Sequence, residues 1–192
     1  MAKITGFKTL DIRFPTSTEK HGSDAMNPDP DYSAAYLILE TDDPKLSGHS
    51  LVFTIGRGND LQCNSIAQLA ETVVGEDLST LEKRIGQIGK DLVRDSQIRW
   101  LGPEKGIPHM AAGGVVNALW DLICKINRKP LWKQLADMSP DALVDLIDFR
   151  HISDAITPAE ALSILQKAQS ARAANEKVLL EKGLPAYTTT PG

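Results

Sequence analysis

Strand-like and helix-like sequence patterns occupy separate parts of this chain. The apolar runs that are rich in branched and aromatic residues, 10–14, 34–41 and 51–55, all lie in its first third. After them, apolar residues recur at spacings of three and four, which is typical of amphipathic helices. The short connection between the second and third runs favours antiparallel pairing. These patterns predict an α+β fold, in which a three-stranded antiparallel meander is followed by a helical bundle.

The first run has the alternation of a half-buried strand. Leu10, Ile12 and Phe14 alternate with two charged residues, and Pro15 then ends the pattern. Successive side chains of a strand point to opposite faces of the sheet. We therefore expect the three apolar side chains to share one face.

Two helices are predicted in the middle of the chain. Asn59 or Asp60 can cap the first helix, which Gly75 then ends. Ser79 and Glu82 have the spacing of a capping box and begin the second helix. In both helices the apolar residues form one stripe, so each helix is expected to bury one face.

A third helix is predicted to be central. Pro108 suits its first turn, and the residues from there to Ile123 leave almost no polar face. The small residues at 111–114 include two glycines, each of which costs a helix about 1 kcal/mol relative to alanine. We expect a neighbouring element to press closely against this stretch, and a short fourth helix to follow at 131–136.

The sequence pattern changes again near residue 143. Residues 143–149 are a strand candidate, and Thr157 with Glu160 opens a long helix that ends near Glu181. Residues 186–192 then begin another strand. A strand, helix, strand order indicates the start of a parallel α/β unit. Because parallel sheets are normally covered on both faces, the chain is expected to be truncated.

The composition disfavours several classes of partner. With 21 Lys and Arg against 25 Asp and Glu, the net charge is −4, so little counterion release is available on nucleic acid. No apolar run is long enough for a bilayer and no signal-peptide pattern is present, so we expect a cytoplasmic protein without a membrane partner. The two cysteines and four histidines have neither zinc-site nor disulfide-framework spacing. The composition therefore favours no metal site in this chain.

Several longer motifs resemble the amino-terminal part of the enolase superfamily, in its mandelate racemase and muconate lactonizing branch. The run NALWDLICKINRKPLWKQLA at 117–136 is similar to the helix and turn that close the capping domain of that superfamily. More specific motifs resemble the L-fuconate dehydratase-like group: RFPTS at 13–17, GSDAMNPDPDYSAAY at 22–36, FTIGRGND at 53–60, RWLGPEKG at 99–106, IDFR at 147–150 and PAYTTTPG at 185–192. The resemblance runs over essentially the whole chain.

The resemblance implies a two-domain enzyme. Residues 1–140 would form the capping domain, and residues 141–192 would form the first elements of a truncated TIM-like barrel. In this family the barrel supplies the Lys or His that moves protons and the carboxylates that hold Mg²⁺. None of these groups has a counterpart here. We therefore expect Mg²⁺ in the complete enzyme only, and no catalytic residue, no metal ligand and no activity in the chain alone.

The resemblance assigns a substrate-covering loop to residues 16–32. Gly22, Ser23, Asp24 and Tyr32 match the family's substrate-binding positions. Their chemistry suits a polyol, because a carboxylate accepts hydrogen bonds from hydroxyls, a tyrosine hydroxyl donates or accepts, and a glycine permits close backbone approach. Without the resemblance, Asp24 would be interpreted as an ordinary turn residue.

Two neighbouring features are expected to be structural. Asp29 and Asp31 flank Pro30 and are ordinary turn formers. The Gly-Arg-Gly turn at 56–58 lacks the third glycine and the Lys-Ser/Thr of a phosphate loop. The resemblance nevertheless places this turn near the mouth of the active site.

The preferred interpretation is the substrate-capping part of an acid-sugar dehydratase that converts L-fuconate to 2-keto-3-deoxy-L-fuconate and water. Its partners would be a small acid sugar, its own missing barrel domain and, in a homo-oligomer, further copies of itself. Two alternatives stay open: a stand-alone, non-catalytic binding module with the cap fold, and a dehydratase for a different acid sugar.

Overall fold

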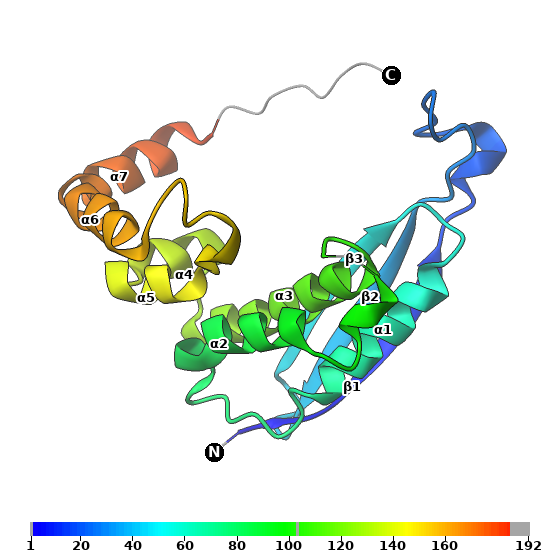
Figure 1. Ribbon diagram of the computed structural model, residues 1–192, viewed down its shortest axis with the longest axis horizontal. Coiled ribbons are helices and arrows are strands. Elements are labelled where there is room, and N and C mark those ends of the chain that lie inside the picture. Colours follow the sequence, from blue (N-terminus) through cyan, green and yellow to red (C-terminus); the bar gives the residue numbers. More distant parts are fainter. Residues whose placement is uncertain (1, 103, 185–192) are drawn as a thin grey trace. The chain divides into compact units, whose positions relative to one another are not determined.

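The computed structural model describes residues 2–102 and 104–184. The chain forms two compact units, Met1–Leu131 and Trp132–Gly192 (Figure 1). Within the described residues, the first unit carries a sheet and helices, and the second consists of helices and turns. None of the helices in these residues is long and apolar enough to cross a membrane.

A three-stranded antiparallel sheet forms the first layer of the first unit. Its strands are β1 (Ile4–Arg13), β2 (Ser33–Thr41) and β3 (Ser47–Thr54), in the order β1-β2-β3. The meander predicted from the sequence is confirmed. β1 begins before the predicted run, because backbone pairing with β2 extends back to Ile4 whatever the polarity of the side chains.

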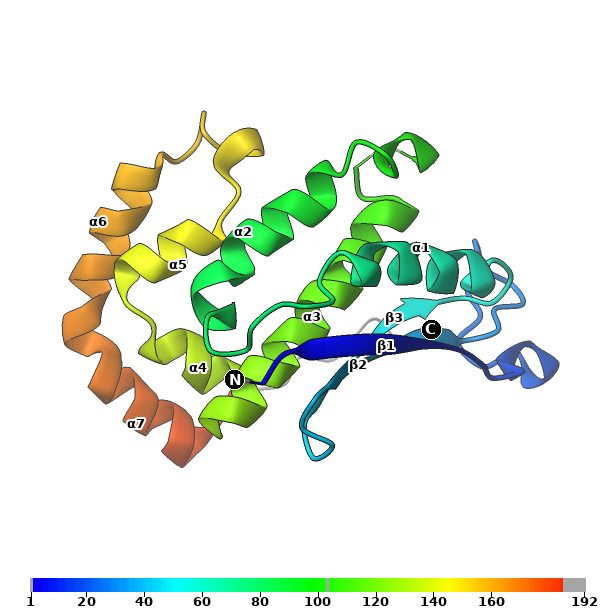
Figure 2. The same cartoon turned by 90° about the horizontal axis from the view of Figure 1, so that it is seen from below.

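Three helices lie on one side of the sheet: α1 (Asn59–Glu71), α2 (Leu81–Arg94) and α3 (Ile107–Asn127). Two of them cover its face, and the third, α2, packs on α3 (Figure 2). α1 packs on β1 and β2, while α3 packs on β2 and β3 and contacts both other helices. The predicted central position of the third helix is confirmed. The largest fully buried side chains are Ile4, Leu37, Leu39, Ile66, Leu69, Leu81, Ile85, Leu119, Leu122, Gln62, Val73 and Val115.

Two glycines allow α3 to approach the sheet closely. A Cβ atom on Gly114 would lie 2.8 Å from Cγ2 of Val52, and a Cβ atom on Gly48 would collide with the backbone oxygen of Ala118. The close neighbour expected at 111–114 is therefore β3. This packing explains why the helix tolerates glycines that lower its intrinsic stability.

α3 also satisfies the outer edge of β3. The backbone N–H of His49 donates to Oδ2 of Asp121 at 2.8 Å, and Nζ of Lys125 donates to the carbonyl of Ser47 at 2.7 Å. The hydroxyl of Ser50 donates to the carbonyl of Gly114 at 2.6 Å. Because unpaired strand edges are templates for association, these contacts close one route to edge-to-edge pairing.

Leu10 and Ile12 of β1 lie on the sheet face that the helices leave open. Leu10 pairs with Tyr36, which pairs with Leu51 on the next strand. The exposed fraction is 43% for Leu10 and 53% for Leu51. The expected shared face is therefore present, but it is the face without helices.

Asp11 and Arg13 of β1 lie on the helix side of the sheet, whereas Lys8 lies on the open side. Asp11 pairs with Ala35, which is fully buried. Its carboxylate accepts hydrogen bonds from Arg13 and from Nδ2 of Asn59, the latter at 2.5 Å. These two partners, Arg13 more than Asn59, hold the pKa of Asp11 below its usual value.

The second unit is built from short helices. They are α4 (Leu131–Asp137), α5 (Pro140–Leu146), α6 (Pro158–Ala168) and α7 (Arg172–Lys182), with 3-10 turns at Phe149–His151 and Gln169–Ala171. The short fourth helix predicted from the sequence is α4. α5 packs against α6, and α6 and α7 meet at the second 3-10 turn.

The prediction of a strand at 143–149 is wrong. This segment contains the end of α5 and the first residue of a 3-10 turn. Ser139 accepts a hydrogen bond from the N–H of Ala142 at 3.3 Å, and Pro140 occupies the first turn, so a helix is already formed when the apolar run begins. Leu143 and Leu146, three positions apart, share a face in a helix.

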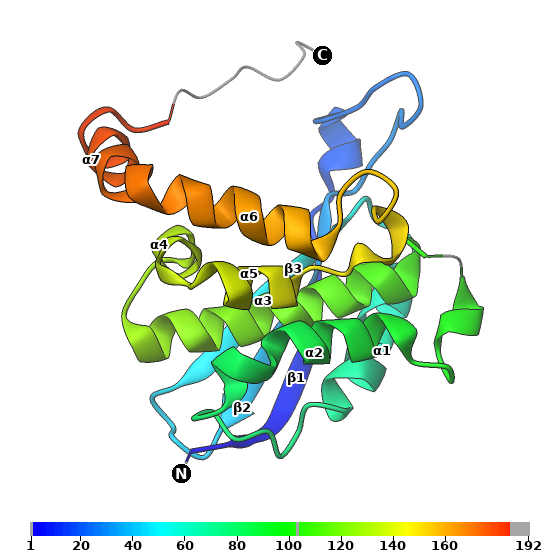
Figure 3. The ribbon, with the colours of Figure 1, turned by 60° about the vertical axis from the view of Figure 1, so that its left-hand side comes forward.

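The long helix predicted from Thr157 is interrupted. Its capping box is confirmed, because the side chains of Thr157 and Glu160 each bond the backbone N–H of the other residue. The turn at Gln169–Ala171 then separates α6 from α7 (Figure 3). The strand predicted at 186–192 lies outside the described residues.

Candidate functional site

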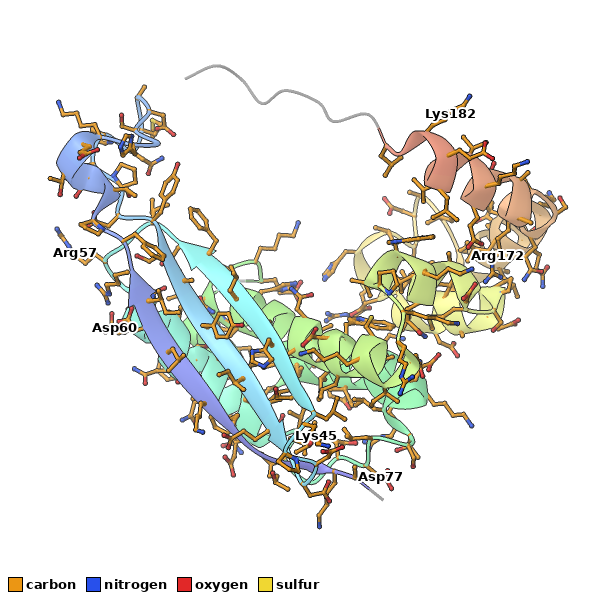
Figure 4. The ribbon with its side chains drawn as sticks, turned by 180° about the vertical axis from the view of Figure 1, so that it is seen from behind. Lys45, Arg57, Asp60, Asp77, Arg172 and Lys182 are labelled. Atoms are coloured by element: carbon orange, nitrogen blue, oxygen red, sulfur yellow. The ribbon has the colours of Figure 1, made fainter. Side chains whose placement is uncertain are left out.

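The long connection between β1 and β2 is the candidate site. It begins with the 3-10 helix η1 (Thr16–Glu19) and returns to the sheet at Ser33. The turn between β3 and α1 lies at the same end of the sheet. Figure 4 shows Arg57 and Asp60 there, with Lys45 and Asp77 at the opposite end. All the substrate-binding residues predicted from the sequence lie in this connection.

The two stems of the loop are hydrogen-bonded to each other. The N–H of Phe14 donates to the carbonyl of Tyr32 at 3.0 Å. The hydroxyl of Thr16 donates to the carbonyl of Pro30 at 2.8 Å and accepts from the N–H of Tyr32 at 2.9 Å. The part of the loop that is free of cross-links is therefore much shorter than the connection itself.

Asp31 bonds to the other stem and to the adjacent turn. Its Oδ1 accepts from the hydroxyl of Ser17 at 2.6 Å and from the N–H of Ser17 at 3.1 Å. Its own N–H donates to the carbonyl of Ile55 at 3.1 Å. The two bonds from Ser17 hold the pKa of Asp31 below its usual value, so this carboxylate is charged at neutral pH.

Gly56 makes the adjacent turn fit against Asp31. Its φ of 122° is unfavourable for other residues, and a Cβ atom there would lie 3.1 Å from Cβ of Asp31. Gly56 and Gly58 are thus explained by the backbone conformation of the turn, with Gly58 in the left-handed region just before α1. A structural role for these glycines agrees with the incomplete phosphate-loop pattern in the sequence.

Asp24 lies in a tight turn at the exposed tip of the loop. Its Oδ1 accepts from the N–H groups of Asn27 at 2.7 Å and Met26 at 2.8 Å. These bonds, that from Asn27 first, lower the pKa of Asp24. Among the described residues, its Oδ2 has a single contact, a long one of 3.4 Å from Nδ2 of Asn27. One oxygen therefore shapes the turn, while the other keeps most of its accepting capacity.

Tyr32 connects the tip of the loop to the sheet. Its hydroxyl donates to the carbonyl of Gly22 at 3.2 Å, and its ring meets that of Phe53 edge-on with centroids 5.2 Å apart. Gly22 has φ 70°, and a Cβ atom there would collide with the hydroxyl of Tyr32. Ser23 is half-buried beside it. The structure thus brings Gly22, Ser23, Asp24 and Tyr32 together in one loop.

Sequence reasoning missed the apolar surface and the stem bonds at this site. Phe14, Phe53 and Ile55 are about half exposed and lie next to the loop stems. The alternation of Leu51, Phe53 and Ile55 could have placed them on one face. The bonds of Thr16 to Tyr32 and of Ser17 to Asp31 have no such signal, because they join residues far apart in sequence.

The described residues do not form a metal centre. They contain no group of three or more His, Cys, Asp or Glu side chains placed to hold a metal ion. The carboxylates of Asp24 and Asp31 are both engaged by donors of the loop itself. The residues present therefore do not fit a Mg²⁺ ion.

Comparison with curated proteins identifies close relatives. No family model matches the chain. It is 53% identical over 190 residues to L-galactonate dehydratase of Hypocrea jecorina, and 47% identical over 189 residues to mitochondrial enolase superfamily member 1 of Xenopus laevis. Each match covers 98% of this chain but 42% of the relative. The chain thus spans about two-fifths of the length of the relatives that it matches.

Comparison with solved structures agrees. The crystal structure of human mitochondrial enolase superfamily member 1 matches with a TM-score of 0.92 and 45% identity, over 98% of this chain and 43% of that one. L-talarate dehydratase from Polaromonas sp. JS666, complexed with Mg and L-glucarate, matches with a TM-score of 0.53 and 20% identity, over 88% of this chain and 41% of that one. The second match supports the fold alone.

Proposed function

The chain belongs to the enolase superfamily, as the amino-terminal part of its members, and we propose that it covers the substrate in an acid-sugar dehydratase. The proposed reaction of the complete enzyme removes a proton from C2 and the hydroxyl from C3 of the acid sugar. The resulting enol becomes the 2-keto-3-deoxy acid, so that one molecule of water is released. The groups that carry out these steps, and the Mg²⁺ ligands, are proposed to lie in the part of the relatives that this chain does not cover.

One observation carries the proposed role of the loop. Asp24 keeps its charge and one weakly bonded oxygen, Oδ2, at an exposed tip, while Oδ1 of the same side chain fixes the turn. A charged acceptor held in this way suits the hydroxyls of a sugar acid, because a charge-assisted hydrogen bond is stronger than a neutral one. Gly22, Ser23 and Tyr32 are the other proposed substrate contacts.

The proposed substrates are six-carbon acids of the L-galacto configuration. We propose L-fuconate first, from the motifs of the loop. A relative that is named L-galactonate dehydratase supports a second candidate. L-Fuconate is 6-deoxy-L-galactonate, so the two acids differ by one hydroxyl at the end of the chain away from the carboxylate. The ratio of kcat/KM for these two acids on the complete protein distinguishes them.

Substitution of Asp24 tests the role of the loop. In the complete protein, Asp24→Asn keeps an oxygen for the turn but removes the charge, and we expect kcat/KM for the preferred acid to fall by about tenfold to a hundredfold. Asp24→Ala should lose at least as much. Asp29→Ala is the matched control, since this neighbouring carboxylate forms no hydrogen bond or ion pair within the described part of the chain. Wild-type kinetics in Asp24→Asn would show that Asp24 does not bind the substrate and only stabilises the turn.

The rival proposal, a non-catalytic cap-fold module, predicts a different result. A screen of acid sugars with the complete protein would then show no release of a 2-keto-3-deoxy acid from any of them. Conversion of either L-galacto acid, lost on removal of divalent metal, would reject the module.

A further inference from the structure

The two stems of the loop between β1 and β2 are joined by several hydrogen bonds at its base. Ordering a flexible loop costs conformational entropy, which a ligand must offset when it binds. Here the stems are already joined by the hydroxyl of Thr16 and the carboxylate of Asp31. The part of the ordering cost that belongs to the stems is therefore met during folding, before any ligand arrives.

The base to which these stems are attached is itself rigid. The N–H of Asp31 bonds the carbonyl of Ile55, and the turn continues into Asn59, which is fully buried. Oδ1 of Asn59 accepts from the hydroxyl of Thr54 at 2.7 Å, and its Nδ2 donates to Asp11. Asp31 is thus connected through backbone and side-chain bonds to β3, α1 and β1.

We propose that Thr16 and Asp31 are positioning residues that form a latch at the base of the loop. The latch presets the segment 18–29, so that the carboxylate of Asp24 is already in place when an acid sugar binds. Neither latch side chain needs to touch the sugar for this role, because the hydroxyl of Thr16 and Oδ1 of Asp31 already bond to groups inside the protein. That the ligand is an acid sugar rests on the proposed function. That the latch orders the segment 18–29 does not depend on it.

Hydrogen exchange of the 192-residue chain tests the mechanical role. The N–H groups of Lys20, His21 and Asp24 are hydrogen-bonded within the loop and report on its order. In Asp31→Ala we expect these amides to exchange at least about tenfold faster, because two hydrogen bonds to a carboxylate are lost. Amides of α3 should be unchanged, since the latch does not contact that helix.

Matched variants separate the latch from a general effect of lost charge. Asp29→Ala, on the other side of Pro30, should leave the exchange rates as in the wild type. Asp31→Asn keeps an acceptor for Ser17 and should restore most of the protection. Wild-type exchange in Asp31→Ala, or equal acceleration in Asp29→Ala, would overturn the latch.

Kinetics of the complete protein test the positioning role. In Asp31→Ala the substrate would have to order the loop when it binds. We therefore expect KM of this variant to rise by about tenfold, while kcat at saturation stays within about twofold of the wild type. Thr16→Val should shift KM in the same direction, and Asp31→Asn should recover most of the loss. An unchanged KM in Asp31→Ala would overturn positioning. Absence of all dehydratase activity in the wild type would instead reject the proposed function, and the exchange experiment would still decide the latch.

Discussion

The two units of this chain bury their apolar side chains to very different degrees. Met1–Leu131 has a continuous core between one sheet face and three helices. In the described part of Trp132–Gly192, the buried residues are Gln134, Met138, Pro140 and Ala161. Ile164, Val178 and Leu180 are half exposed or more. Helices of the second unit are thus amphipathic without an equally complete core.

The second unit leaves an apolar pocket open to solvent. This pocket of about 310 Å³ lies among its four helices, and Leu135, Leu143, Leu165 and Leu179 help to line it. An apolar surface that is left uncovered does not contribute the free energy of burial. We infer that cooperative stability resides mainly in the first unit.

Ion pairs also connect α4 with α7 in the second unit. Lys133 of α4 lies 2.8 Å from Oδ1 of Asp137 and 2.7 Å from Oε1 of Glu176, and Arg172 of α7 lies 3.0 Å from Asp137. Asp137 and Glu176 raise the pKa of Lys133. Partly exposed pairs contribute little and are screened by salt. The comparison therefore teaches that the helices of the first unit are stabilised by extensive apolar burial, whereas those of the second unit have only incomplete burial and ion pairs of small individual effect.

The largest expected difference comes from removing a leucine in each unit. Leu119→Ala empties a fully buried site in α3 and should lower the free energy of unfolding by about 2 to 5 kcal/mol. Leu165→Ala in α6, which already borders the open pocket, should cost less than about 2 kcal/mol. Denaturant unfolding followed by circular dichroism measures both. Equal losses would show that the second unit has a core as effective as that of the first.

Adjacent glycines in α3 give a smaller and sharper contrast. Gly114→Leu overpacks against Val52 and should cost about 1 to 3 kcal/mol. Nothing lies within 4 Å of a Cβ atom on Gly113, so Gly113→Leu should stabilise the helix by about 0.5 to 1 kcal/mol. Thermal melting gives the sign of each change. A stabilised Gly114→Leu variant would contradict the packing of α3 on β3.

Weakening the ion pairs should affect the second unit alone. Asp137→Asn removes the charge that faces both Lys133 and Arg172. We expect amide exchange in α7 to accelerate by up to about fivefold, with no change in α3. Salt at about 1 M should produce part of the same effect in the wild type. Acceleration in both helices would mean that the two units unfold together.

Acid should destabilise the loop between β1 and β2 before it destabilises the core of the first unit. Of the four predicted effects on stability, this one is the smallest. The pKa values of Asp24 and Asp31 are lowered from 3.8 in the folded chain. Their contribution is therefore complete above the unfolded pKa and is lost as the pH falls through the folded values. Loop amides followed by NMR should lose protection below about pH 3.8, while those of α3 stay protected. Full protection of the loop at lower pH would exclude this role for the carboxylates.

Much of the fold could be predicted from local patterns. The apolar run at 34–41 is realised as β2, whose residues Leu37 and Leu39 are fully buried. The spacing of Thr157 and Glu160 is realised as a capping box, and the close packing at Gly114 follows from small residues in an apolar helix. In the site, Gly22 to Asp24 and Tyr32 could be selected from a family resemblance, but not from residue spacing alone.

The sequence by itself determined the order of strands and helices in the first unit, because periods of two and of three to four depend on neighbours along the chain. Only the tertiary structure decided which face of β1 meets the helices and that Asp31 joins the loop stems. An alternating pattern shows that two faces differ, yet the partner of each face is chosen by α1 and α3. Residues 143–149 have a strand-like pattern, but the hydrogen-bonded cap at Ser139 begins a helix at Pro140–Leu146 that includes the first part of this run. Contacts between distant residues, such as Ser17 with Asp31, leave no periodic signal, so packing alone establishes them.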